Sequence, residues 1–289
     1  MISTNANSIF ERVRSLTIQA IFSDDVLFEK VVLKGGNAIA LAFDISSRTS
    51  LDLDFSIEAD FQDPADAAKR LERACAKKFL TAGFTIFDFK FAPRPLIARP
   101  GLDSWGGYEA EFKIVESDAF LRNKANLDRL RMTATVIGPD QMRKVRIDLS
   151  KFEYTVGKLK RDFNDQKIYV YSPMMIAVEK LRAICQQMPE YELRKKPAPR
   201  ARDFFDIQTL VERGGVFLAS EEARELALHI FGAKDVPLEL LLKVIKTREF
   251  HRPDWDSVRF SSPEPLREFD SYFDFVCGQI DLLKTTWNI

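Results

Sequence analysis

The fold is decided by two neighbouring stretches, VVLKGGNAIAL at residues 31–41 and RTSLDLDF at residues 48–55. An apolar strand runs into a glycine pair that opens a helix, and an alternating strand follows. Because successive side chains of a strand point to opposite faces, Asp52 and Asp54 share one face and their apolar neighbours share the other. Adjacent carboxylates repel unless a cation lies between them, and Mg2+ prefers oxygen ligands. The spacing therefore predicts a Mg2+ site beside a glycine turn whose backbone N–H groups can hold a phosphate.

Composition and charge limit the classes of protein to which the chain can belong. With 46% hydrophobic and 30% charged residues, its 289 residues are typical of a globular protein of one large or two smaller domains. The 43 basic and 43 acidic residues cancel, so any RNA contact must come from a local patch. Because the chain has only two histidines, we do not expect a serine or cysteine nucleophile that depends on histidine.

Cysteine usage and the absence of targeting signals indicate the cytoplasm. Cys75, Cys185 and Cys277 are far apart and odd in number, which fits neither a disulfide framework nor a Cys-x-x-Cys metal site. The first residues lack a secretory pattern, and no run of about 18 apolar residues could span a bilayer. We therefore expect a cytoplasmic protein that makes no membrane contact.

The order of the patterns predicts an α+β protein. Its first part combines helices at 5–22 and 63–82 with strands at 84–91, 108–115 and 145–149, and a Pro/Gly-rich turn or loop at 93–107. After the helix-start signal Ser172-Pro173, only helices are predicted, at about 173–187, 201–213, 220–231, 237–247 and 263–285. We expect a mixed-sheet domain at residues 1–170, followed by a C-terminal helical domain at residues 171–289.

A second block of charged residues lies in EKLRA at residues 179–183 and RARDFFDI at residues 200–207. Lys180 lies beside the apolar stripe of its predicted helix, where it can reach a phosphate. On the next helix Asp203 and Asp206 are three residues apart and face the same way. A helix cap and a surface salt bridge would explain this segment equally well.

The link between these two helices is strongly basic. RKKPAPRAR at residues 194–202 has five basic residues in nine and no acid, and its prolines favour an extended conformation. Such a patch can bind the RNA backbone, and its candidate contacts are Arg194, Lys195, Lys196 and Arg200. A merely solvated, mobile link is an equally good interpretation, because charge runs are usually solvated.

The glycine pair followed by Asp-x-Asp resembles the nucleotidyltransferase superfamily of the DNA polymerase β type. Together with the second block, the stretch from Leu33 to Asp206 looks like the AbiEii/AbiGii toxin family of nucleotidyltransferases. The residues that match the motifs of this family are Gly35, Gly36, Arg48, Ser50, Asp52, Asp54, Lys180, Arg202, Asp203 and Asp206.

The resemblance also implies a third carboxylate on a neighbouring strand. Asp148, in the alternating segment VRIDL at residues 145–149, fits that place, although a pairing with Arg146 or Lys144 would explain it structurally. Three carboxylates can hold two Mg2+ ions, one carrying the triphosphate and one activating the attacking hydroxyl. The catalytic set is then Asp52, Asp54, Asp148, Lys180 and Asp203, and the first three of these are the metal ligands. The nucleotide-binding set is Gly35, Gly36, Arg48, Ser50, Lys180, Arg202 and Asp206.

The function implied by the resemblance is transfer of NMP from an NTP to an RNA hydroxyl, at a tRNA 3′ end. The protein would then be the toxin of a toxin–antitoxin or phage-defence pair, with a cognate antitoxin from a neighbouring gene as its partner. Two alternatives stay open: the same machinery can modify a small molecule or a protein, and a catalytically silent member can act as a binding module.

Overall fold

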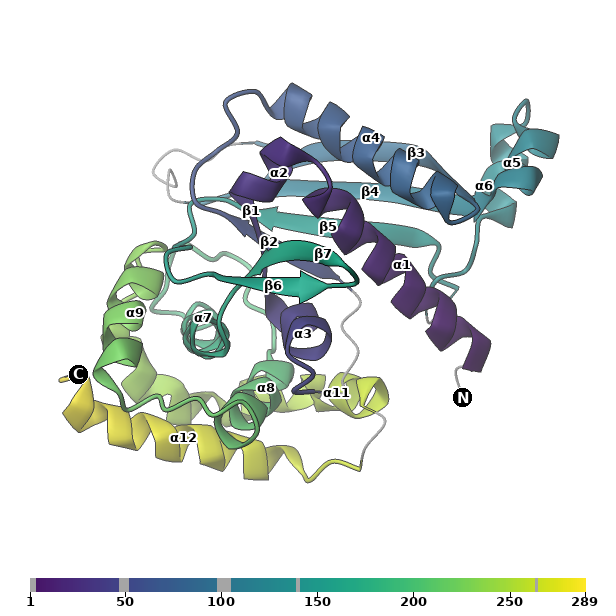
Figure 1. The fold of residues 1–289 in the computed structure, drawn as a ribbon. Helices are drawn as coiled ribbons and strands as arrows, with labels where there is room; N and C mark the ends of the chain where they lie inside the picture. Colours follow the sequence, from purple (N-terminus) through teal and green to yellow (C-terminus); the bar gives the residue numbers. More distant parts are fainter. Residues whose placement is uncertain (1–3, 47–51, 98–104, 139–140, 263–264) are drawn as a thin grey trace.

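The computed structural model describes residues 4–46, 52–97, 105–138, 141–262 and 265–289. Within them a seven-stranded sheet has the order β3-β4-β5-β2-β1-β7-β6 (Figure 1). The strands are β1 (Val31–Leu33), β2 (Leu53–Ile57), β3 (Phe84–Arg94), β4 (Gly107–Glu116), β5 (Lys144–Ser150), β6 (Leu159–Phe163) and β7 (Gln166–Val170). Strand β1 is antiparallel to β2 and parallel to β7, while β2 is parallel to β5. The predicted mixed sheet of an α+β protein is confirmed.

The N-terminal helices α1 (Thr4–Phe22), α2 (Asp25–Lys30) and α4 (Pro64–Thr81) lie along this sheet, and α1 and α4 pack side by side (Figure 1). Asp63 begins α4 as predicted, because its carboxylate accepts hydrogen bonds from the backbone N–H groups of Ala65 and Asp66. Phe79 of α4 meets Phe112 of β4 edge to face, with ring centroids 5.3 Å apart. Helix α4 therefore covers the face of β4 that carries Phe112.

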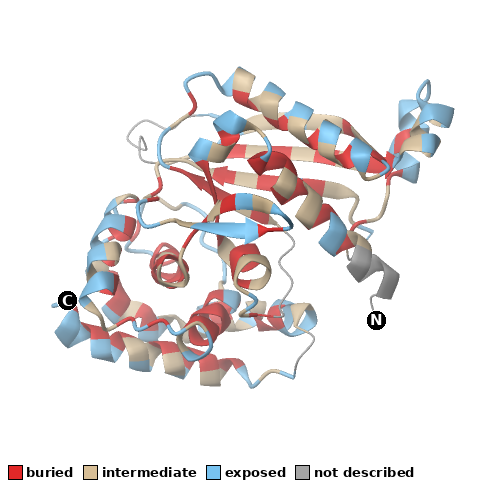
Figure 2. Ribbon diagram, viewed as in Figure 1, coloured by how far each residue is buried: buried red, intermediate tan, exposed pale blue. Residues whose placement is uncertain are grey.

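The C-terminal part is helical, as predicted. Its elements are α7 (Pro173–Cys185), α8 (Ala201–Glu212), α9 (Glu221–Gly232), the 3-10 helix η2 (Leu238–Thr247), α10 (Arg248–His251), the 3-10 turn η3 (Arg252–Asp254), α11 (Trp255–Ser261) and α12 (Phe269–Thr286). The hydroxyl of Ser172 caps α7 by accepting from the N–H of Met175. Helix α7 is surrounded by α8, α9 and η2 and is buried on nearly all sides (Figure 2). The single apolar stripe predicted for this helix, made of Met174, Ala177, Leu181 and Ile184, was too narrow. Met174 is only partly buried, whereas Met175 and Val178, outside the stripe, are fully buried.

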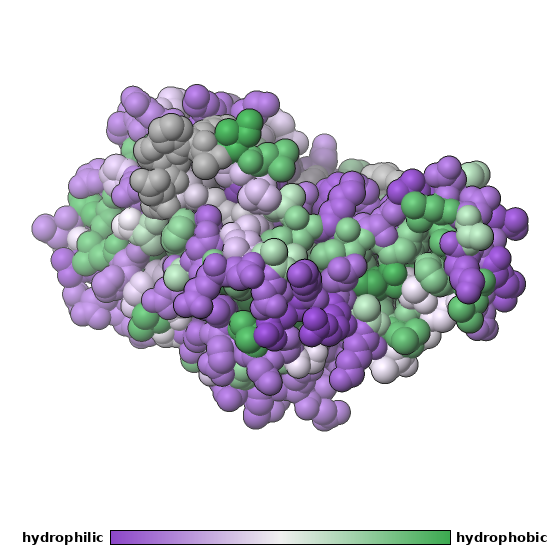
Figure 3. Space-filling view, turned by 90° about the horizontal axis from the view of Figure 1, so that it is seen from above, coloured by the Kyte–Doolittle hydropathy of each residue, from purple (hydrophilic) through white to green (hydrophobic). Residues whose placement is uncertain are grey.

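Most buried apolar residues form one cluster that continues from the sheet into the helical part, with Phe55, Ile147, Leu181 and Phe204 among them. Helices α5 (Ser117–Asn123) and α6 (Leu127–Thr133) pack on a small separate cluster at one end. Seen from above, the surface is mostly hydrophilic with separate hydrophobic areas, including that end of the molecule (Figure 3). In the described part of the chain, no helix is long and apolar enough to cross a membrane.

Candidate active site

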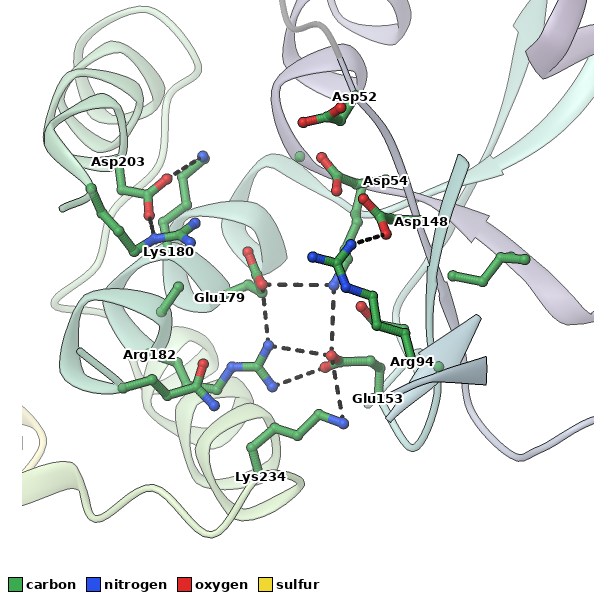
Figure 4. Close-up of a pocket in the computed structure, with 18 of the residues that line it drawn as sticks. Asp52, Asp54, Arg94, Asp148, Glu153, Glu179, Lys180, Arg182, Asp203 and Lys234 are labelled. Carbon is green, nitrogen blue, oxygen red and sulfur yellow. Dashed lines mark hydrogen bonds and ion pairs between the residues drawn. The ribbon is translucent and has the colours of Figure 1, made fainter. Parts of the chain in front are cut away.

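Three aspartates lie together on one wall of a cavity of about 410 Å³ (Figure 4). Asp54 of β2 lies directly opposite Asp148 of β5, because these two strands are parallel and in register. Asp52 precedes β2 and lines the same cavity. Leu53 and Phe55 are buried on the opposite face, with 1% and 0% of their surface exposed. The predicted alternation, two acids above an apolar floor, is confirmed, and the structure brings Asp148 to them.

The negative charges of these acids repel one another. The pKa of Asp54 is raised to about 6, because burial together with the neighbouring Asp148 and Asp52 outweighs the opposing effects of Lys34 and Arg202. Burial also raises the pKa of Asp148. Among the described residues, no three His, Cys, Asp or Glu side chains are grouped so that they could hold a metal ion as they stand. Three carboxylates on one wall of the cavity are nevertheless the oxygen donors that Mg2+ prefers, so the residues present fit such an ion.

Arg94, at the end of β3, pairs with Asp148. Its Nη1 atom donates to Oδ1 of Asp148 at 2.9 Å (Figure 4). The same atom donates to Oε2 of Glu109, also at 2.9 Å. Of the two structural partners considered for Asp148, Lys144 pairs instead with Glu111 on the neighbouring strand, and the cation that pairs with Asp148 is Arg94. No sequence signal links Arg94 to Asp148, since they are brought together only by the pairing of β3, β4 and β5.

The glycine turn serves the aspartates directly. Gly35 opens α3 (Gly35–Asn37) with a φ of +71°, and a Cβ atom at this position would lie 2.9 Å from Oδ2 of Asp54. The backbone N–H of Lys34 donates to the carbonyl oxygen of Asp54 at 2.9 Å. Glycine is thus required by both the left-handed backbone and the close approach of the carboxylate. After this turn the chain continues as a π-helical turn, η1 (Ala38–Ala42).

Asn37 fixes the other aspartate. Its amide Nδ2 donates to the carbonyl oxygen of Asp52 at 2.6 Å, and its Oδ1 accepts from Nη1 of Arg14 at 2.8 Å. Asn37 is fully buried, and its bond to Arg14 is buried with it. The only sequence signal for this positioning role is its place directly after the glycine pair. Arg48 and Ser50, two of the predicted nucleotide-binding residues, lie outside the described residues.

The opposite wall of the cavity comes from α7 and α8. Nζ of Lys180 lies 2.9 Å from Oδ1 of Asp203 and 2.7 Å from Oδ2 of Asp206, and Arg200 pairs with Asp203. The exposed fractions of Lys180, Asp203 and Asp206 are 4%, 0% and 1%, so the alternative of a surface salt bridge was wrong. Burial raises the pKa of Asp203, but Arg200 and Lys180 outweigh this effect and hold it well below its usual range. Lys180, Arg202 and Asp203 line the cavity, whereas Asp206 stands behind Lys180.

Between the two walls lies a cluster of buried charges that the sequence did not reveal. Oε2 of Glu153 lies 2.9 Å from Nη1 of Arg182, and Oε1 of Glu153 lies 3.6 Å from Nζ of Lys34 and 3.7 Å from Nζ of Lys234 (Figure 4). Burial raises the pKa of Glu153, but the three cations outweigh it and hold the pKa at about 2. Glu179 joins the cluster at 3.1 Å from Arg182. Lys34, Glu179 and Arg182 belong to the quoted motifs, but no pattern pointed to Glu153 or Lys234.

Comparison with known proteins identifies the family. The family described as nucleotidyl transferase AbiEii toxin of a type IV toxin–antitoxin system matches residues 17–275. The chain belongs to the AbiEii toxin family. It is therefore a nucleotidyltransferase toxin of a type IV toxin–antitoxin system, which confirms the nucleotidyltransferase toxin that the resemblance implied and adds the type of system. No curated protein matches this AbiEii family member in sequence.

Solved structures show the same fold. MenT4, a nucleotidyltransferase toxin from Mycobacterium tuberculosis H37Rv, is similar with a TM-score of 0.58 and 14% identity over 96% of this chain and 85% of MenT4. JHP933 from Helicobacter pylori is similar with a TM-score of 0.50 and 15% identity, over 100% of this chain and 95% of that one. At these identities, the two similarities show that the AbiEii protein has the same fold as these structures.

The basic link of the AbiEii protein is divided between the cavity and the surface. Arg194 is half-buried and lines the cavity, and Arg200 lines it while paired with Asp203. Lys195 and Lys196 are exposed. Burial lowers the pKa of Arg194, with Arg200 nearby adding to the effect. Two of the four predicted RNA contacts therefore face the proposed site, and two face solvent beside it.

Proposed function

We propose that this protein transfers NMP from an NTP to an RNA hydroxyl, with a tRNA 3′ end as the acceptor and Mg2+ as the cofactor. The observation that carries the proposal is the pairing of Asp54 with Asp148 on adjacent strands, beside Asp52, at the wall of a cavity large enough for a nucleotide. Asp52, Asp54 and Asp148 would hold two Mg2+ ions. Bound there, the ions would neutralise the triphosphate and lower the pKa of the attacking hydroxyl.

The remaining residues would bind and orient the nucleotide. Gly35 and Gly36 line the cavity next to Asp54, where a phosphate can approach the backbone without a Cβ in the way. Lys180 and Arg202 bring positive charge from the opposite wall, and Asp203 fixes the position of Lys180. The remaining members of the proposed nucleotide-binding set are Arg48, Ser50 and Asp206, of which Asp206 would act by orienting Lys180.

The acceptor would reach the site over the basic link. Lys195 and Lys196 are exposed, and Arg194 extends the same charge into the cavity, so an RNA backbone can follow this path to Asp148. A cognate antitoxin would oppose the resulting toxicity.

The test is to incubate the purified protein with each labelled NTP, Mg2+ and total tRNA, and to locate the label. Asp54→Asn keeps the shape of the side chain but removes its charge, so transfer should fall by several orders of magnitude while the melting temperature stays close to that of the wild type. Asp162→Asn, at an exposed position of β6, is the matched control and should retain full activity. Full activity of Asp54→Asn would refute the metal-site assignment. Absence of labelled RNA with all four NTPs would favour a small-molecule or protein acceptor.

The RNA path has its own test. Because phosphate contacts release counterions, replacing Arg194, Lys195 and Lys196 by Gln should weaken tRNA binding and flatten its salt dependence. The control is a matched triple replacement on α4, where one arginine and two lysines are exposed: Lys69, Arg73 and Lys77. Equal salt dependence of the two triple variants would reject the link as the RNA contact.

A further inference from the structure

One residue of the cavity differs in kind from the charged residues around it. Trp105, two residues before the start of β4, lines the cavity and is half-buried. The other two tryptophans of the chain, Trp255 and Trp287, are buried, with 5% and 2% of their surface exposed. Tyr108 also lines the cavity, but only 6% of its surface is exposed and its hydroxyl donates to Asp60. Trp105 is therefore the large aromatic surface that the described part of the cavity offers to a ligand.

The indole ring is held in place from behind. Nε1 of Trp105 donates to the hydroxyl of Tyr191 at 2.7 Å, and this hydroxyl donates to the carbonyl oxygen of Lys234 at 2.6 Å. The two rings are 6.2 Å apart, and 3% of the Tyr191 surface is exposed. Because the indole N–H is satisfied inside the protein, the ring loses little conformational freedom when a ligand packs on it.

The position of the ring matches the layout of a nucleotide. Tyr191 ties Trp105 to the backbone of Lys234, and Lys234 stands at the end of the cavity away from Asp52 and Asp54 (Figure 4). The carboxylates and cations of the cavity suit metal and phosphate, whereas a planar apolar surface suits a base. Base–aromatic stacking is favourable for every base, since each has a π face.

We propose that Trp105 is a stacking platform for a nucleobase in this cavity. The proposal rests on the proposed function, which brings a nucleotide and an RNA end to the site. The base comes from the NTP or from the 3′-terminal nucleotide of the acceptor, and stacking alone confers no strong preference among the four bases.

Intrinsic fluorescence tests this directly, because Trp105 is the tryptophan that a ligand in the cavity can touch. With Mg2+ present, each NTP should quench the emission of the wild type, and ribose 5-triphosphate without a base should not. A short RNA with an intact 3′-terminal base and the same RNA with an abasic end test the second source. Quenching by NTP assigns the base of the donor nucleotide, and quenching only by RNA with an intact end assigns the acceptor base.

Two variants give the affinity side of the test. Trp105→Phe keeps an aromatic ring and should bind with nearly unchanged affinity but without the fluorescence change, while Trp105→Ala should weaken binding by about 5- to 150-fold in calorimetry. Trp255 and Trp287 remain as an internal reference for folding in both variants. NTP and RNA binding by calorimetry with no quenching, and with equal affinity for Trp105→Ala, would overturn the inference and leave the proposed function standing. Failure of the wild type to bind any NTP or RNA would overturn both.

Discussion

Replacing Gly35 by Ala should abolish most activity at a modest cost in stability. The left-handed φ of +71° costs an L-residue about 1–2 kcal/mol, so the free energy of unfolding should fall by about that amount. The new Cβ would lie 2.9 Å from Oδ2 of Asp54, which is too close. Turning the carboxylate relieves this contact cheaply, but it moves the proposed metal ligand. Since a displacement of about 1 Å can lower a rate roughly 100-fold, nucleotide transfer should fall by about two orders of magnitude.

Gly215 provides a matched control for this variant. Its φ is +67°, and a Cβ there would meet no heavy atom within 4 Å. Gly215→Ala should therefore lose the same 1–2 kcal/mol while retaining full transfer. Urea unfolding and the labelled-NTP assay on both variants separate the two effects. Equal activity of Gly35→Ala and Gly215→Ala would show that catalysis does not depend on the present place of Asp54.

Three further perturbations test the surroundings of the site. Asn37→Ala removes the 2.6 Å bond to the carbonyl oxygen of Asp52, which should lower the free energy of unfolding by about 1–3 kcal/mol and reduce transfer. Burial lowers the pKa of His251 to about 4. As the pH falls from about 6.5 to 4, the unfolded chain therefore binds a proton that the folded chain does not bind. The free energy of unfolding, measured by urea titration, should fall by on the order of 3 kcal/mol over this range. Arg94→Gln removes the cation that occupies Asp148, so the affinity for Mn2+ or Mg2+ should rise several-fold in calorimetry.

Each of these has a control within the chain. Asn123→Ala removes a comparable amide bond on α5, far from the cavity, and should leave transfer unchanged. His251→Gln should flatten the stability profile between pH 6.5 and 4, and an unchanged slope would assign it to other groups. Arg146→Gln removes an exposed cation two residues from Asp148 on β5. If both arginine variants gain the same metal affinity, general electrostatics rather than the Arg94 contact is responsible.

Local sequence patterns predicted most of the strands and helices of the fold. Alternation placed Leu53 and Phe55 in the core, and the caps at Asp63 and Ser172 begin their helices as predicted. The β6–β7 hairpin was missed although the sequence contains a signal for it. Its two-residue turn is Asn164-Asp165, and these residue types tolerate the positive φ that both of them adopt. Such signals act within a few residues, which is why a sequence can report them.

The site was harder to predict where its contacts join distant elements. Arg94 reaches Asp148 only through the register of two strand pairs, and Glu153, which follows β5, meets Lys234 only because the segment after α9 lies beside it. The burial of Lys180 was also hidden, because a sequence stripe shows one covered face of a helix and cannot show that neighbours cover the others. The spacing of the motifs therefore predicted the aspartates, but it did not predict cations such as Arg94 that pair with them.

The register of β2 with β5 also bears on how the toxin is made. Asp54 and Asp148 are about 90 residues apart in the chain, so their pairing is a long-range contact that needs both strands to be present. A nascent or truncated chain that ends before β5 carries the glycine turn and the Asp-x-Asp pair without their third carboxylate, and one that ends before α8 has no Asp203 for Lys180. A fragment released by premature termination or proteolysis should therefore be harmless, although it contains the motif by which the family is recognised.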